Sequence, residues 1–140
     1  MSRVAGVYET VVYAVDVVAA ARFYSDVLEL SPLEEPTELS AAFRLDDRGV
    51  FLIFDPVRAS AVGRRVPAHG ATGAGHVAFA VEEGGLEAWA GELRRRGIDI
   101  EREITWEEGG RSLYVRDPAG NSVELVEGEA WPVSLRDATD

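Results

Sequence analysis

The chain has 140 residues, no cysteine and a formal net charge of -11. This length suits one domain with its own core, and the absence of cysteine excludes disulfides and thiolate metal sites. The negative charge argues against nucleic-acid binding, which requires clusters of lysine and arginine. Any bound metal is therefore expected to have oxygen and imidazole ligands.

The hydropathy pattern predicts no association with membranes. No stretch approaches the roughly 20 apolar residues that span a bilayer, and the first ten residues, MSRVAGVYET, contain no long apolar run. The sequence therefore predicts neither a membrane span nor a signal peptide. We expect a cytoplasmic protein whose partner is a small molecule rather than a membrane or a nucleic acid.

The first half of the chain has the pattern of a strand, a helix and two further strands. Residues 10–15, TVVYAV, are β-branched and aromatic, which favours a strand, and Asp16 is a suitable helix N-cap. Ser31-Pro32 closes the helical unit, and two short strands are predicted at 41–45 and 50–54. The helix is indicated by an apolar stripe of Ala20, Phe23, Tyr24, Val27 and Leu28.

Residues 55–75 predict a loop, because they contain four glycines and two prolines. Arg58, Arg64 and Arg65 gather there in an otherwise acidic chain. Since this segment leads directly into His76, we expect it to be the mobile lid or rim of a pocket.

The pattern then restarts. Residues 76–81, HVAFAV, predict a strand, and Glu82-Glu83 supply the acidic residues typical of a helix start. A helical stripe of Leu86, Trp89, Ala90 and Leu93 follows and ends at Gly97, which suits a helix C-terminus. Further strands are predicted at 98–105, 112–116 and 122–126.

The two halves therefore form an internal repeat, in which each half reads as a strand, a helix and two or three strands. Glu9 lies seven residues before Asp16, as His76 lies seven residues before Glu83. The sequence identity between the halves is weak, so the repeat is indicated by element order and spacing alone.

Side chains alternate between the two faces of a strand. This places Glu9, His76 and Glu124 on faces turned away from the helices, where Ala78 and Ala80 are small and leave room for a ligand. Taken singly, each has a simpler interpretation. Glu9 and Glu124 could be solvated charges, and His76 could be a structural histidine.

Three segments carry a resemblance to a known family. Residues 16–30, DVVAAARFYSDVLEL, residues 75–81, GHVAFAV, and residues 116–126, RDPAGNSVELV, are similar to the vicinal oxygen chelate superfamily of glyoxalases, bleomycin resistance proteins and extradiol dioxygenases. The resemblance implies one α+β domain over residues 1–140. It would consist of two βαβββ modules, at about 7–55 and 74–128, that form an open half-barrel sheet and are joined by the glycine- and proline-rich loop.

The resemblance also implies a divalent metal, Mn, Fe, Ni or Zn, held by Glu9, His76 and Glu124. Many relatives have histidine at the position of Glu9. Ile53 stands where glyoxalase-type members carry a further carboxylate, which argues against a four-ligand glyoxalase I. Glu29 stands where relatives usually have the glycine that ends the first helix, and a side chain in that left-handed position costs about 1 kcal/mol.

The function implied by the resemblance is a metal-dependent lyase, isomerase, dioxygenase or antibiotic-modifying transferase. Its substrate would bind the metal through neighbouring oxygens. The alternative is a non-catalytic, bleomycin-resistance-like protein that binds a drug or metabolite, favoured by acidity and by Trp89, Trp106 and Trp131. Relatives with two modules usually pair, so we expect a homodimer. Candidate pocket residues, for which core or surface roles stay open, are Tyr13, His69, Arg111 and Tyr114.

Overall fold

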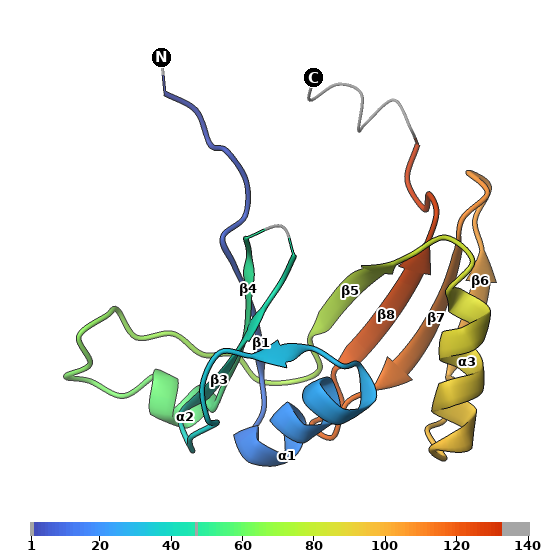
Figure 1. Ribbon diagram of the computed structural model, residues 1–140. Helices are drawn as coiled ribbons and strands as arrows, with labels where there is room; N and C mark the ends of the chain where they lie inside the picture. The colour runs from blue at the N-terminus through green and yellow to red at the C-terminus, as the bar shows by residue number, and fades with distance from the viewer. Residues whose placement is uncertain (1, 47, 133–140) are drawn as a thin grey trace. The chain divides into compact units, whose positions relative to one another are not determined.

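A computed structural model describes residues 2–46 and 48–132. The contacts divide the chain into two compact units, residues 1–75 and residues 76–140. Each unit contains one open four-stranded mixed sheet and one principal helical segment, as Figure 1 shows for each unit by itself. The long loop predicted at 55–75 belongs to the first unit.

The first unit begins with strand β1 (Glu9–Tyr13), which is followed by helix α1 (Val17–Arg22) and its π-helical continuation η1 (Phe23–Val27). Strands β2 (Ser31–Pro32), β3 (Ser40–Arg44) and β4 (Val50–Phe54) complete the sheet, and α2 (Pro56–Ala59) is a single helical turn. The strand order is β1-β4-β3-β2, with β1 parallel to β4 and the other pairs antiparallel.

The second unit repeats this topology. Its elements are β5 (His76–Val81), α3 (Leu86–Arg95), β6 (Arg102–Thr105), β7 (Arg111–Arg116) and β8 (Ser122–Glu127). The order is β5-β8-β7-β6, with β5 parallel to β8. Both units are therefore βαβββ modules, which confirms the predicted α+β fold.

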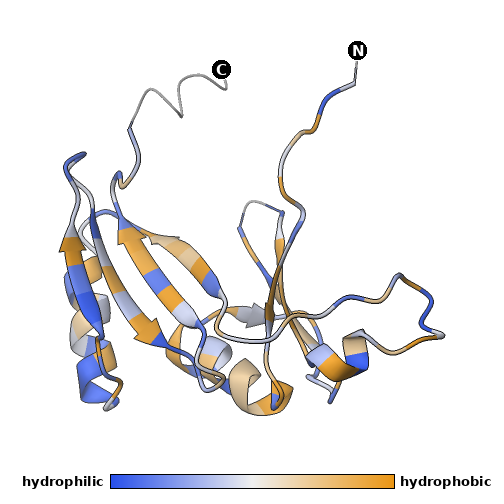
Figure 2. Cartoon of the chain, turned by 180° about the vertical axis from the view of Figure 1, so that it is seen from behind, coloured by the Kyte–Doolittle hydropathy of each residue, from blue (hydrophilic) through white to orange (hydrophobic). Residues whose placement is uncertain are grey.

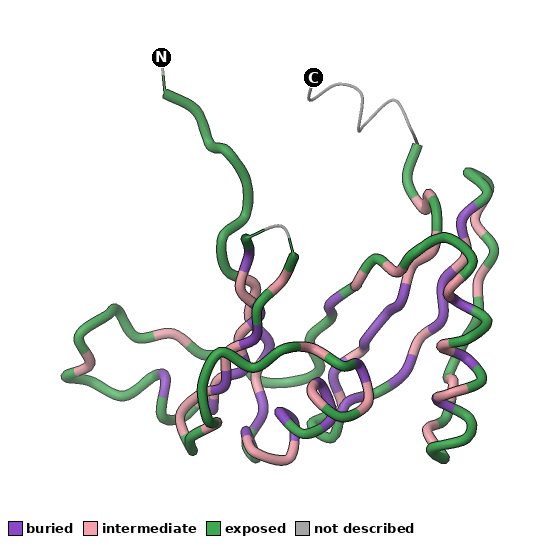
Figure 3. The backbone as a smooth tube through the Cα atoms, in the orientation of Figure 1, coloured by how far each residue is buried: buried purple, intermediate pink, exposed green. Residues whose placement is uncertain are grey.

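Each helix covers one face of its own sheet. Helix α1 packs on β3 and β4, and α3 packs on β7 and β8. The buried positions follow the strands and the sheet-facing sides of the helices in Figure 3. In the first unit the core is aromatic, because the Tyr24 ring lies 4.7 Å from Phe51 and 6.3 Å from Phe43, centre to centre. Neither helix packs on the opposite face of its own sheet.

The sequence placed most elements correctly, with differences at their ends. The expected strand at 98–105 starts only at Arg102. Helix α3 starts after Gly85 rather than at Glu82-Glu83, since Gly84 has a φ of 84° and the Gly85 amide closes a turn on the Glu82 carbonyl. Among the described residues, no helix is long and apolar enough to cross a bilayer.

Glu29 adopts the left-handed conformation that its position in the sequence suggested, with a φ of 59°. A Cβ atom is strained in this conformation and glycine is not. We predict that Glu29→Gly raises the free energy of unfolding by roughly 1 kcal/mol, as measured by denaturant titration. Glu34→Gly, at an exposed site of ordinary φ, is the control and should be neutral or destabilising. Equal effects of both substitutions would contradict the assignment of strain.

Candidate metal centre

His76 is the first residue of β5, opposite Ser122 at the start of β8. Its Nδ1 lies 3.1 Å from the Ser122 carbonyl oxygen. A carbonyl can only accept, so Nδ1 carries the proton and donates it. This bond fixes the ring orientation, and in the neutral imidazole it leaves the lone pair on Nε2.

Nε2 of His76 lies 3.3 Å from Oε1 of Glu124. In the neutral tautomer both atoms are acceptors, so a positive charge has to be shared between them. Either a second proton on His76 or a metal cation can supply it. Two ligand atoms that are each about 2.1 Å from one metal ion lie about 3.0–3.4 Å apart. The pair therefore fits as two neighbouring ligands of a divalent cation.

Glu124 is held in place by the hairpin that precedes it. The Asp117 carboxylate, only 4% exposed, accepts hydrogen bonds from the amides of Ala119 and Asn121 and from the Asn121 side chain. These bonds fix the turn between β7 and β8. They therefore set the register in which Glu124 pairs with Tyr114 and with Ala78.

The Glu124 carboxylate is almost out of solvent, although it lies on the face that α3 does not cover. The residue is 7% exposed, and its Oε2 accepts a 2.6 Å hydrogen bond from the Ser112 hydroxyl. Polar residues of this kind interrupt the otherwise apolar strands in Figure 2. A simple exposed charge, the alternative interpretation from the sequence, does not describe Glu124. We therefore replace it with glutamine rather than alanine in the experiments below, because truncation would open a buried space.

Tyr114 lies next to this pair. Its ring stacks on His76, with centres 6.3 Å apart and planes inclined by 22°. Burial, followed by the negative charge of Glu124 and hydrogen bonding to it, raises the pKa of Tyr114 above its usual value of 10. The phenol is therefore protonated at neutral pH.

Among the residues the structure describes, no three histidine, aspartate or glutamate side chains gather closely enough to hold a metal ion. His76 and Glu124 are brought together as predicted, and both belong to the second unit. Glu9 is the first residue of β1 in the first unit and is exposed. It shares a sheet face with Val11 and Tyr13, as the alternation predicted.

The sheet register corrects one sequence comparison. Two residues beyond His76, Ala78 pairs with Glu124, and two residues beyond Glu9, Val11 pairs with Leu52. The position that corresponds to Glu124 is therefore Leu52 and not Ile53, which is fully buried on the helix-covered face. Gly49 directly precedes β4, whereas Asn121 separates Gly120 from β8, so counting from the turn glycine gave the wrong residue. Neither residue is a carboxylate, so the conclusion stands.

Tyr13 and His69, both predicted pocket residues, contact each other in the first unit. The Tyr13 hydroxyl lies 2.7 Å from His69 Nδ1, and the His69 ring meets Phe54 edge to face with centres 4.7 Å apart. The Arg64 guanidinium lies over the Phe54 ring, 5.7 Å from its centre. The His69 amide donates to the Ala59 carbonyl at 3.1 Å. This hydrogen bond holds the two ends of the segment 59–69 together.

Arg111, the remaining predicted pocket residue, lies elsewhere. It has the opposite orientation in β7 to Ser112 and Tyr114, and its guanidinium donates a 2.6 Å hydrogen bond to Glu87 of α3. This ion pair lowers the pKa of Glu87. Arg111 therefore belongs to the face of the sheet that the helix covers.

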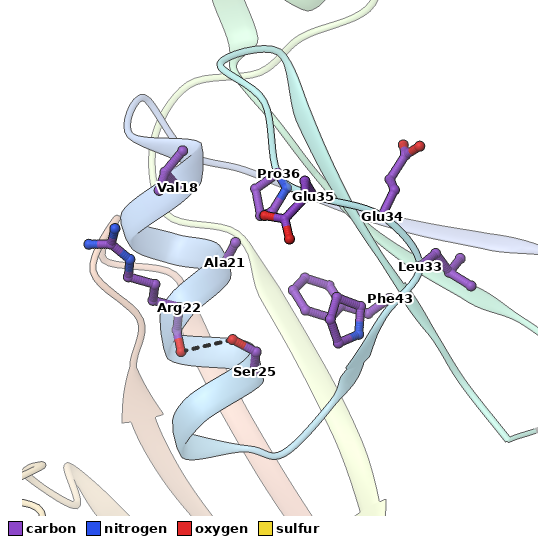
Figure 4. A pocket seen from close by; sticks show the side chains of 10 residues that line it. Val18, Ala21, Arg22, Ser25, Leu33, Glu34, Glu35, Pro36 and Phe43 are labelled. Carbon is purple, nitrogen blue, oxygen red and sulfur yellow. Dashed lines mark hydrogen bonds between the residues drawn. The ribbon is translucent and has the colours of Figure 1, made fainter.

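The first unit also has a hollow that the sequence did not indicate. It has a volume of about 620 Å³ and lies between α1 and the segment that joins β2 to β3, on the helix-covered side of the sheet. Figure 4 shows the Ser25 hydroxyl turned to the Arg22 carbonyl on its helical wall. The lining residues are Val18, Ala21, Arg22, Ser25, Pro32, Leu33, Glu34, Glu35, Pro36 and Phe43.

The two βαβββ modules are matched in known proteins. Residues 6–125 match the family model of the Glyoxalase/Bleomycin resistance protein/Dioxygenase superfamily. The chain is 34% identical to a lactoylglutathione lyase from Agrobacterium tumefaciens of known structure, with a TM-score of 0.86, over 93% of this chain and 98% of that one. A glyoxalase/bleomycin resistance protein from Catenulispora acidiphila has the same fold, at 22% identity, a TM-score of 0.62 and coverage of 89% and 100%.

A curated relative is a metallothiol transferase, FosB, from Shouchella clausii, 40% identical over 55 residues. That alignment spans 38% of this chain and 38% of the transferase. The family model decides the class, because its match covers most of the chain, residues 6–125. The chain belongs to the Glyoxalase/Bleomycin resistance protein/Dioxygenase superfamily.

We predict that the loop at 55–75 is mobile only between Ala59 and His69, which are joined by a backbone hydrogen bond. Amides of residues 61–68 should exchange hydrogen much faster than those of β4, because most of this segment is exposed and its base is closed at Ala59 and His69. Tyr13→Phe should accelerate exchange of the His69 amide about fivefold, since one hydrogen bond is worth about 1 kcal/mol. Tyr8→Phe, at an exposed tyrosine, is the control. Exchange across 61–68 as slow as in the strands would contradict a mobile rim.

Proposed function

We propose that the protein is a metal-dependent enzyme of the glyoxalase/dioxygenase type. It acts on a small molecule that binds the metal through two neighbouring oxygens. His76 and Glu124 are two of the metal ligands. Glu9, at the family position in the first module, is the third.

The observation that carries this proposal is the His76–Glu124 pair. The Nδ1 proton is committed to the Ser122 carbonyl, and the free Nε2 faces a buried carboxylate oxygen at 3.3 Å. One imidazole and two carboxylates suit Mn²⁺, Fe²⁺, Ni²⁺ or Zn²⁺. A metal with three protein ligands keeps positions open for substrate.

The residues around the pair have separate roles in this proposal. A bound metal would act as a Lewis acid that stabilises negative charge developing on the substrate oxygens. The stacked Tyr114 limits the access of water on one side of His76 and presents a neutral phenol as a hydrogen-bond donor. Ala78, the neighbour of Glu124 in β5, keeps the adjoining surface open for a ligand.

The relatives give the first reactions to assay. The structural relative of 34% identity is a lactoylglutathione lyase, and the transferase is a metallothiol enzyme. Both names refer to sulfur chemistry, so lactoylglutathione is the first compound to test with metal-loaded protein, and we expect little or no lyase activity on it because the fourth ligand is missing. Leu52, without a carboxylate, argues for a three-ligand site and against four-ligand glyoxalase I chemistry.

The second candidate function is binding of a drug or metabolite without catalysis. It is favoured by the acidity of the chain and by exposed aromatic residues such as Trp131, which is 70% exposed. The two functions differ in their need for metal. A binding protein of this kind would keep its ligand affinity after its metal has been removed by chelation.

The metal requirement is tested by thermal unfolding. Metal at 100 times its dissociation constant stabilises the folded protein by about 2.7 kcal/mol, so Mn²⁺, Ni²⁺ or Zn²⁺ should raise the melting temperature by roughly 10 °C. Glu124→Gln keeps the shape and removes the charge, and it should lose most of this rise. Glu103→Gln, at an exposed carboxylate in β6, should keep it. No metal-dependent rise in the wild type, or the same rise in Glu124→Gln, would refute the metal centre.

We also propose a homodimer. Each module leaves the outer edges of its end strands unpaired within its own sheet, namely β1 and β2 in one and β5 and β6 in the other, and such edges are usually covered. Sedimentation equilibrium at micromolar concentrations should give about twice the mass of the 15.2 kDa chain. A monomer throughout that range would rule the dimer out.

A further inference from the structure

A chain of three polar groups reaches from a loop indole to the candidate ligand Glu124. The Trp106 indole Nε1 donates to the Ser112 Oγ at 2.8 Å. The Ser112 Oγ in turn lies 2.6 Å from Glu124 Oε2. Ser112 is 1% exposed, and Glu124 is 7% exposed, so the second bond lies in the interior of the module.

The direction of both bonds follows from the chemistry of the donors. An indole N–H can only donate, so the Ser112 oxygen accepts from it. The single hydroxyl proton of Ser112 is then free to go to the carboxylate. The second bond is therefore charge-assisted, which agrees with its short length.

The indole is held by the turn between β6 and β7. The Trp106 amide donates to the Gly110 carbonyl at 2.8 Å, and the Gly109 amide donates to the Trp106 carbonyl at 2.9 Å. The Gly110 amide donates to the Glu129 carbonyl, and a Cβ atom on Gly110 would collide with that carbonyl oxygen. The turn is thus packed closely against the chain that follows β8.

The two oxygens of Glu124 consequently have different surroundings. Oε2 is engaged by Ser112, whereas Oε1 faces His76 Nε2 at 3.3 Å. A carboxylate fixed through one oxygen can rotate little about its last bond. It presents the other oxygen in one direction only.

We infer that Ser112 and Trp106 are positioning residues. They hold Oε2 of Glu124, so that the carboxylate binds the cation through Oε1 alone. This inference rests on the proposed metal centre. It adds that affinity for the metal depends on two groups that never touch it, as hydrogen-bond partners of metal ligands commonly do.

The inference is tested by calorimetric titration with Zn²⁺ or Mn²⁺. Ser112→Ala removes both bonds and should weaken metal binding about 10- to 100-fold, while Ser112→Thr retains a hydroxyl and should restore most of the affinity. Trp106→Phe removes only the outer donor and should weaken binding by a smaller factor. Trp89→Phe, on α3, is the matched control and should bind like the wild type.

A second measurement follows the hydrogen-bonded chain of Trp106, Ser112 and Glu124, which we call the relay, first in the absence of metal and then with Zn²⁺. The ¹⁵N–¹H signal of the Trp106 indole, identified by its loss in Trp106→Phe, should shift in Glu124→Gln, because the charge on the acceptor chain is removed. In the wild type the same signal should shift on addition of Zn²⁺, and Ser112→Ala should abolish that response. Both shifts together support the relay.

The outcomes separate the inference from the proposed function. The relay is overturned if Ser112→Ala binds metal as tightly as the wild type, or if the indole signal does not shift in Glu124→Gln. Neither result contradicts the metal centre. A wild type that binds no divalent metal overturns both. If Ser112→Ala fails to fold, Trp106→Phe and the Ser112→Thr comparison decide the question.

Discussion

A carboxylate that is withdrawn from water has to be hydrogen-bonded or neutralised, because burying a lone charge costs several kcal/mol. Glu124 is under this constraint on the sheet face that α3 does not cover, and it is only 7% exposed. Ser112 satisfies one of its oxygens, and the other faces the lone pair of a histidine whose second nitrogen is already committed. The second module is therefore arranged around one negative charge that still needs a positive partner. In our proposal that partner is a divalent metal.

The same constraint explains how the fold serves the candidate centre. The helix buries the apolar residues of one sheet face, which leaves the other face free for polar groups. Parallel pairing of β5 with β8 sets His76 opposite Ser122, so that Glu124 lies two residues further along the neighbouring strand and on the same face. His76 and Glu124, 48 positions apart in the sequence, meet for this reason. The buried Asp117 carboxylate holds the hairpin that keeps this register.

Much of this could be predicted from the sequence, because strand alternation and helical spacing are local properties. They gave the repeated order of elements and the faces of Glu9, His76 and Glu124. The left-handed backbone at Glu29 was implied by the family resemblance. Features that depend on pairing across the sheet could not be predicted in this way. The correspondence of Leu52 to Glu124 depends on the pairing register of β1 with β4 and of β5 with β8. The Trp106–Ser112–Glu124 relay joins residues from three segments. For Arg111 the sequence left pocket, core and surface roles open, and its contact with Glu87 of α3 could not be predicted because the two residues are far apart in the sequence.

The central claim is that His76 and Glu124 hold a divalent cation specifically, although the chain carries a net charge of -11 that attracts cations everywhere. Paramagnetic broadening of backbone amide signals by substoichiometric Mn²⁺ tests it most directly. The account predicts that broadening is strongest at His76 and Glu124, and at Glu9 in the first module. Broadening that is strongest at exposed acidic pairs such as Glu107-Glu108, with these three amides unaffected, would contradict it.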